Sequence, residues 1–337
     1  MPDEKLTAYR GGKALRRGWT TGSCAAAASQ AAAVLLLTGI APPEIHLHTP
    51  GGITFCLPVE DAHMSGNAAV STVRKDAGDD QDITNGVRIT ASVRRIEKGV
   101  TIEGGAGVGR ITRPGLAMPV GEAAINPGPR QQITDAVHRA AEQNGYNGGF
   151  SVTISVEDGE ALAVQTYNGH LGIVGGISIL GTSGIVEPMS EKALVDTIRL
   201  ELDSLYAQGQ RIAFLCPGNY GADFARDTLG LDLERAVKCS NFIGEAFDHA
   251  AYRGYPEILL VGHAGKLVKM AAGVMNTHSS VADARQEIFT AHAALCGAPR
   301  ETLEGLMAAI SVDACVELLD EVNLRQPVLS RIGREME

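Results

Sequence analysis

Aromatic side chains are scarce in this 337-residue chain, which has seven Phe, seven Tyr and the single Trp19. Proteins that bind nucleic acids by base stacking normally carry more of them. Positive charge is also in short supply, because 39 acidic residues against 29 Lys and Arg give a formal net charge of −10. Phosphate backbones are bound by clustered Lys and Arg. The composition therefore predicts no nucleic-acid partner.

Cysteine pairs at metal-binding or redox spacing are absent. The six cysteines are scattered without a CxxC pair: Cys24, Cys56, Cys216, Cys239, Cys296 and Cys315. In a chain of this length the pattern is typical of reduced thiols in a cytoplasmic protein. His46 and His48 are two apart on a predicted strand but have no third ligand near them in sequence. We therefore expect no metal site in the protein itself.

Long uninterrupted apolar runs are also missing. Basic residues precede an alanine-rich run at residues 24–37, which is the pattern of a signal peptide, but Ser29 and Gln30 interrupt it. Residues 22–40 are too broken to span a bilayer comfortably. A buried helix is the favoured interpretation, with a signal peptide as the alternative. A cytoplasmic location without membrane association follows from the favoured one.

The pattern of elements predicts two domains, since the chain exceeds the size at which a single core stops growing. An N-terminal mixed α+β domain, residues 1–165, would contain helices at 20–37 and 133–144 and strands at 44–48, 53–59, 87–96, 99–102 and 150–156. A C-terminal α/β domain, residues 166–337, would alternate strands at 211–216 and 257–261 with helices at 191–207, 241–253, 265–274, 281–295 and 300–319. This alternation predicts a mainly parallel sheet.

Residues 169–190 are dense in glycine and end in hydroxyl and carboxylate side chains. Because glycine has no Cβ, such a backbone can approach a ligand closely. Ligands of parallel sheets lie beyond the carboxyl ends of the strands. We therefore expect loops 181–187, 217–221 and 262–266 to line a nucleotide-sized site at the edge of the C-terminal sheet.

Two further glycine-rich segments resemble phosphate-binding motifs without matching them. Residues 104–109 are followed by Arg110, at the position where the dinucleotide-binding fingerprint has its third glycine. A turn lying against a ligand is therefore expected in place of a dinucleotide site. Residues 262–266 have shortened glycine spacing and no magnesium-binding hydroxyl, but suit an anion.

Hydroxyl and acidic residues form two more candidate sites. Residues 20–23 at a helix start could hold an anion beside Arg16 and Arg17, or could simply cap the helix. The acidic run at 76–82 would ordinarily be a solvated turn, but Lys75 before it favours a functional role.

Several segments together resemble one family, the cobalt-precorrin-5B C1-methyltransferases, or CbiD family. They run in order through most of the chain: 18–28, 73–86, 104–130, 171–190, 240–250 and 259–279. Ala106 departs from the family pattern, which has a glutamate there.

The resemblance implies transfer of a methyl group from S-adenosylmethionine to C1 of cobalt-precorrin-5B in anaerobic cobalamin (vitamin B12) biosynthesis, giving cobalt-precorrin-6A and S-adenosylhomocysteine. Cobalt would be present only as part of the tetrapyrrole substrate. The N-terminal domain would contact the tetrapyrrole, and the C-terminal domain would bind the methyl donor.

Each candidate residue is given a role on this basis. The cofactor would be bound by Gly175, Gly176, Gly181, Thr182, Ser183, Gly184, Glu187, Asn219 and Asn241. The substrate carboxylates would be bound by Arg16, Arg17, Thr20, Thr21, Lys75, Arg110, Arg113, Arg130 and Lys266. The proton released after methylation would be accepted by Asp76, Asp79 or His263.

Two other functions are weighed against this one. A non-catalytic tetrapyrrole carrier would need the arginines but no cofactor loop. A metal-dependent hydrolase would use His263, His278 and Asp283. A homodimer and transient contact with other enzymes of the cobalamin pathway are both compatible with the sequence.

Overall fold

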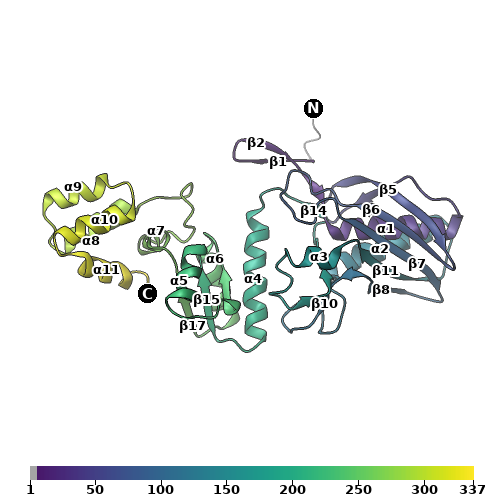
Figure 1. Cartoon of the computed structure of the whole chain (residues 1–337). Coiled ribbons are helices and arrows are strands. Elements are labelled where there is room, and N and C mark those ends of the chain that lie inside the picture. Colours follow the sequence, from purple (N-terminus) through teal and green to yellow (C-terminus); the bar gives the residue numbers. More distant parts are fainter. Residues whose placement is uncertain (1–5) are drawn as a thin grey trace. The chain divides into compact units, whose positions relative to one another are not determined.

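The computed structural model describes residues 6–337, which divide into two compact units at Glu191 and Lys192 (Figure 1). We call them unit 1 and unit 2. The division lies well beyond the boundary expected near residue 165, because strands between residues 173 and 186 pair with strands of unit 1.

Unit 1 is built on a six-stranded sheet with the order β4-β5-β6-β7-β11-β8. Every neighbouring pair is antiparallel except β11 and β8, so the predicted α+β class is confirmed. The strands are β4 (Glu44–His48), β5 (Thr54–Ser65), β6 (Ala68–Arg74), β7 (Arg88–Ile96), β8 (Val100–Gly104) and β11 (Gly149–Val156).

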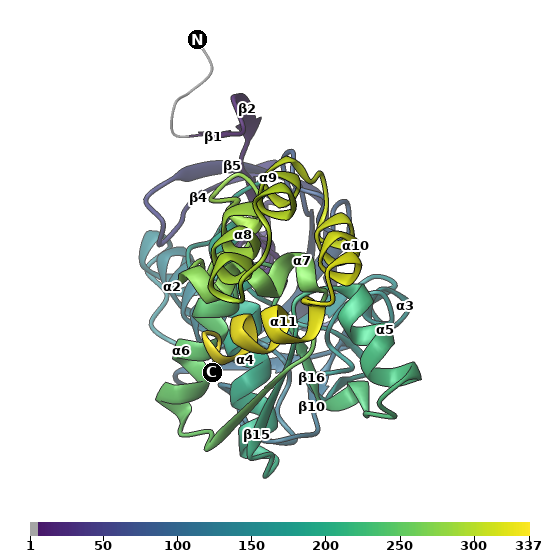
Figure 2. The same ribbon diagram turned by 90° about the vertical axis from the view of Figure 1, so that its left-hand side faces the viewer.

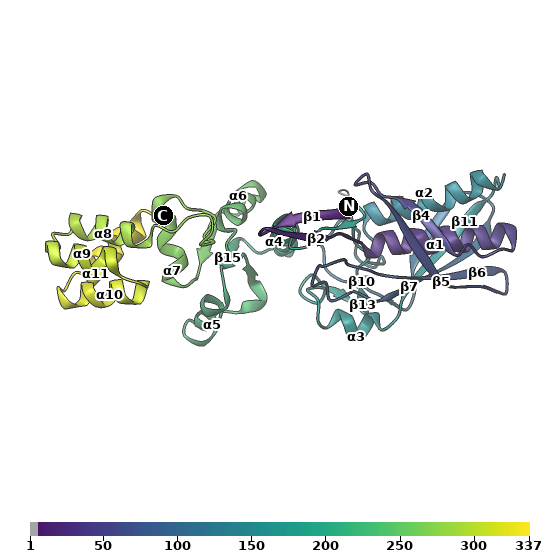
Figure 3. The same cartoon turned by 90° about the horizontal axis from the view of Figure 1, so that it is seen from above.

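Two helices, α1 (Thr21–Thr38) and α2 (Pro127–Gln143), lie side by side (Figure 3), and α1 packs against this sheet. By length and composition α1 could cross a membrane, but most of it is buried inside unit 1. Seven of its 18 residues are alanines, whose small side chains let it pack closely against both the sheet and α2. The buried-helix interpretation is confirmed.

Short strands between residues 173 and 186 pair with short strands from earlier in unit 1. β12 (Ile173–Val174) pairs with β10 (Arg110–Ile111), β13 (Gly176–Ile177) with β9 (Gly107–Val108), and β14 (Ile185–Val186) with β3 (Gly18–Trp19). Unit 1 also contains a hairpin of β1 (Thr7–Arg10) and β2 (Lys13–Arg16), and the short helix α3 (Gly159–Ala163). The glycine-rich segment thus belongs to unit 1, and its expected place at the C-terminal sheet is wrong.

Unit 2 contains the predicted parallel sheet, with the order β16-β15-β17. Its strands are β15 (Ile212–Cys216), β16 (Ala236–Lys238) and β17 (Glu257–Leu260), and its flanking helices are α4 (Glu191–Ala207), α5 (Asn219–Asp227) and α6 (Ile243–Arg253). The C-terminal helices, grouped together in Figure 2, share a separate apolar core.

The C-terminal helices are shorter than expected. Helix α7 (Ala264–Leu267) and a 3-10 turn (Val268–Ala272) replace the helix predicted over 265–274. The single helix predicted over 300–319 is two, α9 (Arg300–Ala308) and α10 (Val312–Glu321), because Ser311 caps the second. Helices α8 (Arg285–Leu295) and α11 (Arg325–Arg334) complete the group.

Candidate active site

Three segments distant in sequence meet beside the start of α1 in unit 1. The backbone N–H of Trp19 donates to the Asp76 carbonyl oxygen at 2.9 Å, while β14 pairs with Gly18 and Trp19. A Cβ on Gly18 would lie 2.2 Å from the Ala77 carbonyl carbon, so only glycine permits this approach. The contacts bring the acidic run and the end of the glycine-rich segment against the two predicted arginines.

Ion pairs link these segments. Arg16 donates two hydrogen bonds to Asp76, and its backbone N–H donates to Asp79 Oδ2 at 2.6 Å. Arg17 Nη2 lies 2.7 Å from Glu187 Oε1. The Arg16 hydrogen bond, more than any other contact, holds the pKa of the Asp76 carboxyl below its ordinary value. Asp76 is therefore a poor proton acceptor at neutral pH.

Lys75 is buried at the base of the acidic loop. Its ammonium donates to Asp82 and, at 2.6 Å, to Thr84 Oγ1. Burial opposes ionisation of Asp82, but Lys75 and Thr84 outweigh it, so the pKa of Asp82 is below its ordinary value. Lys75 thus fixes the loop from inside and is not presented to a ligand.

The remaining predicted substrate arginines of unit 1 lie outside this cluster. Arg110 is half exposed and pairs with Glu103 at 3.1 Å. Arg130 is largely buried and donates to the carbonyl oxygens of Ile102 and Ile125. Arg113 is exposed, with its side-chain carbons against Gly172. Only Arg110 and Arg113 of this group are open to solvent.

The start of α1 is capped by the protein's own oxygens. The Gly22 N–H donates to the Leu180 carbonyl at 2.8 Å, and the Ser23 N–H to Thr20 Oγ1 at 3.2 Å. Thr20 and Thr21 are both buried. The capping alternative is therefore correct, and the anion-site alternative is wrong.

The glycines of the 175–184 loop serve mainly close packing within the chain. A Cβ on Gly181 would lie 2.2 Å from Thr20 Oγ1, one on Gly184 2.8 Å from Ser23 Oγ, and one on Gly176 2.2 Å from the Gly107 carbonyl oxygen. Thr182 and Ser183 are exposed, and among the glycines named here only at Gly175 would an added Cβ meet nothing within 4 Å.

The predicted ligand-facing turn at 104–109 is packed in the same way. A Cβ on Gly107 would lie 2.0 Å from the Val156 carbonyl oxygen, and one on Gly109 2.4 Å from the Ile173 side chain. This turn therefore lies against protein, and its interpretation as a surface for a ligand is wrong.

The carboxyl edge of the unit 2 sheet is the second polar site. β15 is central: the chain passes from β15 to β16 on one side and then from β16 across to β17 on the other, so a topological switch point lies between β15 and β17. Lys266, which follows β17, donates from Nζ to the Pro217 carbonyl after β15 and, at 3.3 Å, to the Ser240 carbonyl after β16. One ammonium group thus ties together the three loops of the edge, and burial lowers its pKa.

Polar and aromatic groups lie near Lys266 at this edge. Helix α5 begins at Asn219, and no side chain caps it. A ligand would therefore not compete with a capping side chain for its first N–H groups. The exposed Tyr220 ring lies 5.9 Å from the His263 ring. Asn241 Nδ2 donates to Asn276 Oδ1 at 2.9 Å, next to Ser240, which has the unusual φ of +53°. Sequence reasoning missed Tyr220, whose signal was an aromatic residue beside a strand end in an aromatic-poor chain.

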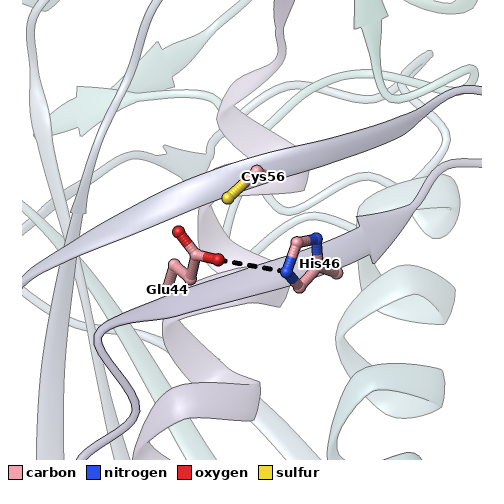
Figure 4. A group of neighbouring side chains, drawn as sticks. All are labelled: Glu44, His46 and Cys56. Atoms are coloured by element: carbon pink, nitrogen blue, oxygen red, sulfur yellow. Dashed lines mark ion pairs between the residues drawn. The ribbon is translucent and has the colours of Figure 1, made fainter.

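The predicted hydrolase ligands do not converge. Asp283 pairs with Arg285, and His278 Nδ1 contacts Ser280 Oγ at 2.6 Å. In residues 6–337 one group of three potential metal ligands lies within reach of a common ion, and it is Glu44, His46 and Cys56 (Figure 4). The hydrolase alternative loses its proposed centre.

Comparison with known proteins decides the family. The CbiD sequence profile matches residues 8–188, and the profile of the CbiD C-terminal domain matches residues 276–337. The chain belongs to the CbiD family. A CbiD relative from Ruminiclostridium cellulolyticum, named cobalt-precorrin-5B C(1)-methyltransferase, is 52% identical over 95% of this chain and 83% of its own length.

A second relative agrees with this assignment. A protein of the same name from Citrobacter koseri is 44% identical over 95% of this chain and 84% of its own. The crystal structure of a cobalamin biosynthesis protein (CbiD) from Archaeoglobus fulgidus is 30% identical, with a TM-score of 0.45 over 84% of this chain and 88% of its own. The family resemblance stated from the sequence is confirmed.

Proposed function

We infer that this CbiD chain is a methyltransferase that methylates C1 of cobalt-precorrin-5B and forms cobalt-precorrin-6A in cobalamin biosynthesis. The observation that carries the inference is 52% identity over 95% of the chain to a protein named for this reaction. The mostly buried position of α1 in unit 1 supports a core helix over a signal peptide, and we propose a cytoplasmic location on that basis.

We propose S-adenosylmethionine as the methyl donor, bound at the carboxyl edge of the unit 2 sheet. When bound, it supplies an electrophilic methyl group. The residues present fit it: the uncapped start of α5 suits its carboxylate, and the Tyr220 and His263 rings offer a surface for adenine. Asn219 and Asn241 provide hydrogen bonds at the same edge. Lys266 orders the edge and does not contact the cofactor in this proposal.

For the tetrapyrrole we propose the exposed arginines of unit 1. Its carboxylates suit bidentate guanidinium groups, Arg16 and Arg110 are half open to solvent, and Arg113 is exposed. Binding at Arg16 or Arg110 would exchange a protein carboxylate for a substrate carboxylate. The inward-facing groups Thr20, Thr21, Lys75 and Arg130 then act by holding the segments in place.

Positioning is the main contribution that the chain can make to this reaction. Methyl transfer from sulfur to carbon needs in-line alignment, and pre-organisation can contribute about 7–11 kcal/mol. The proton lost afterwards requires a base, for which Asp79 suits better than Asp76. Asp79 is exposed and only its Oδ2 receives the Arg16 amide, whereas both Asp76 oxygens are held by a guanidinium group.

The test is anaerobic incubation of the full chain with S-adenosylmethionine and cobalt-precorrin-5B, followed by mass spectrometry. A gain of one methyl group together with S-adenosylhomocysteine is expected. Tetrapyrrole that stays bound but unmethylated would instead support the carrier function. Asp79→Asn should slow the reaction, whereas Asp61→Asn, an exposed carboxylate on β5, is the control that should leave it unchanged.

A further inference from the structure

Glu44, His46 and Cys56 gather on the exposed face of the unit 1 sheet, at its β4 edge (Figure 4). Glu44 and His46 are two apart on β4, and Cys56 lies directly opposite His46 in the antiparallel register with β5. The neighbouring residues on the two strands, Ile45, Leu47 and Leu57, are buried on the other face. The register and the core therefore hold the three side chains on one patch of surface.

The distances suit a single ion. His46 Nε2 lies 3.1 Å from Glu44 Oε1, and the three ligand atoms all lie within 4.8 Å of one another. Bonds of about 2.0–2.3 Å to a tetrahedral ion place neighbouring ligand atoms about 3.3–3.8 Å apart. Small rotations of exposed side chains are enough to close this geometry without moving the strands.

The electrostatics of the cluster also favour a cation. One carboxylate, one thiolate and a neutral imidazole would together carry a charge of −2, which a divalent ion neutralises. Binding would then release the thiol proton to solvent.

We propose that Glu44, His46 and Cys56 form a binding site for a divalent transition-metal ion of the Zn²⁺ or Co²⁺ class. Thiolate and imidazole ligands favour these ions over Mg²⁺ and Ca²⁺, which take oxygen ligands. Three protein ligands leave a fourth position to solvent. The ion bridges β4 and β5, and thereby fastens the edge strand of the sheet to its neighbour.

The same sheet offers a matched comparison. His63 Nδ1 lies 3.0 Å from Asp61 Oδ2 on β5, both exposed, in a histidine–carboxylate pair that resembles His46 and Glu44. This pair is not part of any three-ligand group among the described residues. It therefore separates the effect of a full ligand set from that of an ordinary surface ion pair.

Anaerobic titration of the reduced full-length protein with Co²⁺ tests the site. We expect one ion per chain, a sulfur-to-cobalt charge-transfer absorption band, and displacement of that band by Zn²⁺. The band should disappear in Cys56→Ser and His46→Gln, and Glu44→Gln should bind at least tenfold more weakly. Thermal unfolding of the parent should shift to higher temperature with Zn²⁺, because only the folded chain holds the ligands together.

The controls are His63→Gln and Cys296→Ser, of which the second removes a partly exposed thiol far along the chain. Both should keep the band and the stoichiometry. Absence of a band in the parent, its survival in Cys56→Ser, or its loss in His63→Gln would overturn the proposal. All three ligands are exposed, so their variants should fold, and unchanged emission from Trp19 verifies this.

Discussion

The Arg16 guanidinium grips the Asp76 carboxylate with two parallel hydrogen bonds, Nη1 to Oδ2 and Nη2 to Oδ1, both 2.7 Å long. Paired contacts of this kind are more specific in geometry than a single ion contact. These two hydrogen bonds join the end of β2 to a loop 60 residues later. They make Arg16 part of the framework of unit 1 as well as a candidate for substrate binding.

Arg16 and Asp76 should show a measurable coupling energy in the free energy of unfolding. In a double-mutant cycle with Arg16→Gln and Asp76→Asn, we expect a coupling energy of about 1 kcal/mol, since the pair is partly exposed. Denaturant unfolding followed by emission of Trp19, the only tryptophan, reports on unit 1 alone. The looser Arg10–Glu187 pair, at 3.7 Å, is the control and should give almost none.

The pair should also make the stability of unit 1 depend on pH. The folded-state pKa of Asp76 is lowered, so its stabilisation is present above the unfolded pKa of about 3.9 and is lost as the pH falls through the folded value. Asp76→Asn should therefore reduce stability at pH 7 and narrow its difference from the parent near pH 2. An equal difference at both pH values would contradict this linkage.

Gly181→Ala should destabilise unit 1 by at least about 2 kcal/mol, because the new Cβ would meet the Thr20 side chain and the residue has a φ of +124°. Trp19 emission during unfolding measures the loss. Gly169→Ala, where nothing lies within 4 Å of the added Cβ, is the matched control and should change stability by less than about 0.5 kcal/mol. A tolerated Gly181→Ala would mean that the loop packs loosely on α1.

Tyr220→Ala should weaken binding of S-adenosylhomocysteine about 5- to 150-fold, if adenine stacks on this ring with the usual 1–3 kcal/mol. Isothermal titration calorimetry measures the change. Tyr252→Ala is the control, because Tyr252 is equally exposed and lies 6.0 Å from a histidine ring, His249, but on α6 away from the sheet edge. Equal losses in both variants would remove the cofactor from this edge.

Glu201, on α4, is a buried carboxyl group whose pKa is raised to about 7, chiefly by burial, with Lys238 opposing the shift. The folded state then binds more protons than the unfolded state between about pH 4.5 and 7, so stability falls as the pH rises through that window. At about 1.4 kcal/mol per pH unit, the cost above pH 7 is about 3 kcal/mol.

Replacement of this carboxyl by an amide removes that cost. Glu201→Gln should raise the unfolding temperature at pH 8 and leave it almost unchanged near pH 4.5, as followed by circular dichroism. The exposed Glu245→Gln, which loses an ion pair with Arg199, should show no such gain at either pH. A Glu201→Gln protein less stable than the parent at pH 8 would show that Glu201 is ionised and paired in the folded state.

Local patterns predicted the secondary structure of this protein better than they predicted its sites. The strands over 44–48 and 150–156 follow from alternation of apolar and polar residues, and Thr20 caps α1 as its hydroxyl suggests. These features depend on neighbours in sequence. The hairpin of β1 and β2 and the strand β6 were missed, because their polar residues mask a weak alternation.

The sites depended on contacts that no local pattern encodes. Glycines at 104–109 and 175–184 indicated close approach, but sequence alone could not tell whether a ligand or another strand approaches them. Likewise the arginines were identified as positive groups, whereas their pairing with Asp76 and Glu187 depends on segments 60 and 170 residues away. Cys56 became a partner of His46 only through the strand register.

The first turn of α1 donates hydrogen bonds to the carbonyl oxygens of Leu180 and Gly184, which has a consequence for folding during translation. This apolar helix leaves the ribosome early, but the residues that cap and cover its start are made about 160 positions later. At about 5–20 residues per second, translation of that interval takes roughly 8–30 s. For that time the start of this alanine-rich helix lacks the residues that cap it. A chaperone that binds short apolar segments would find its target here, and the need for it would end once residue 190 emerges.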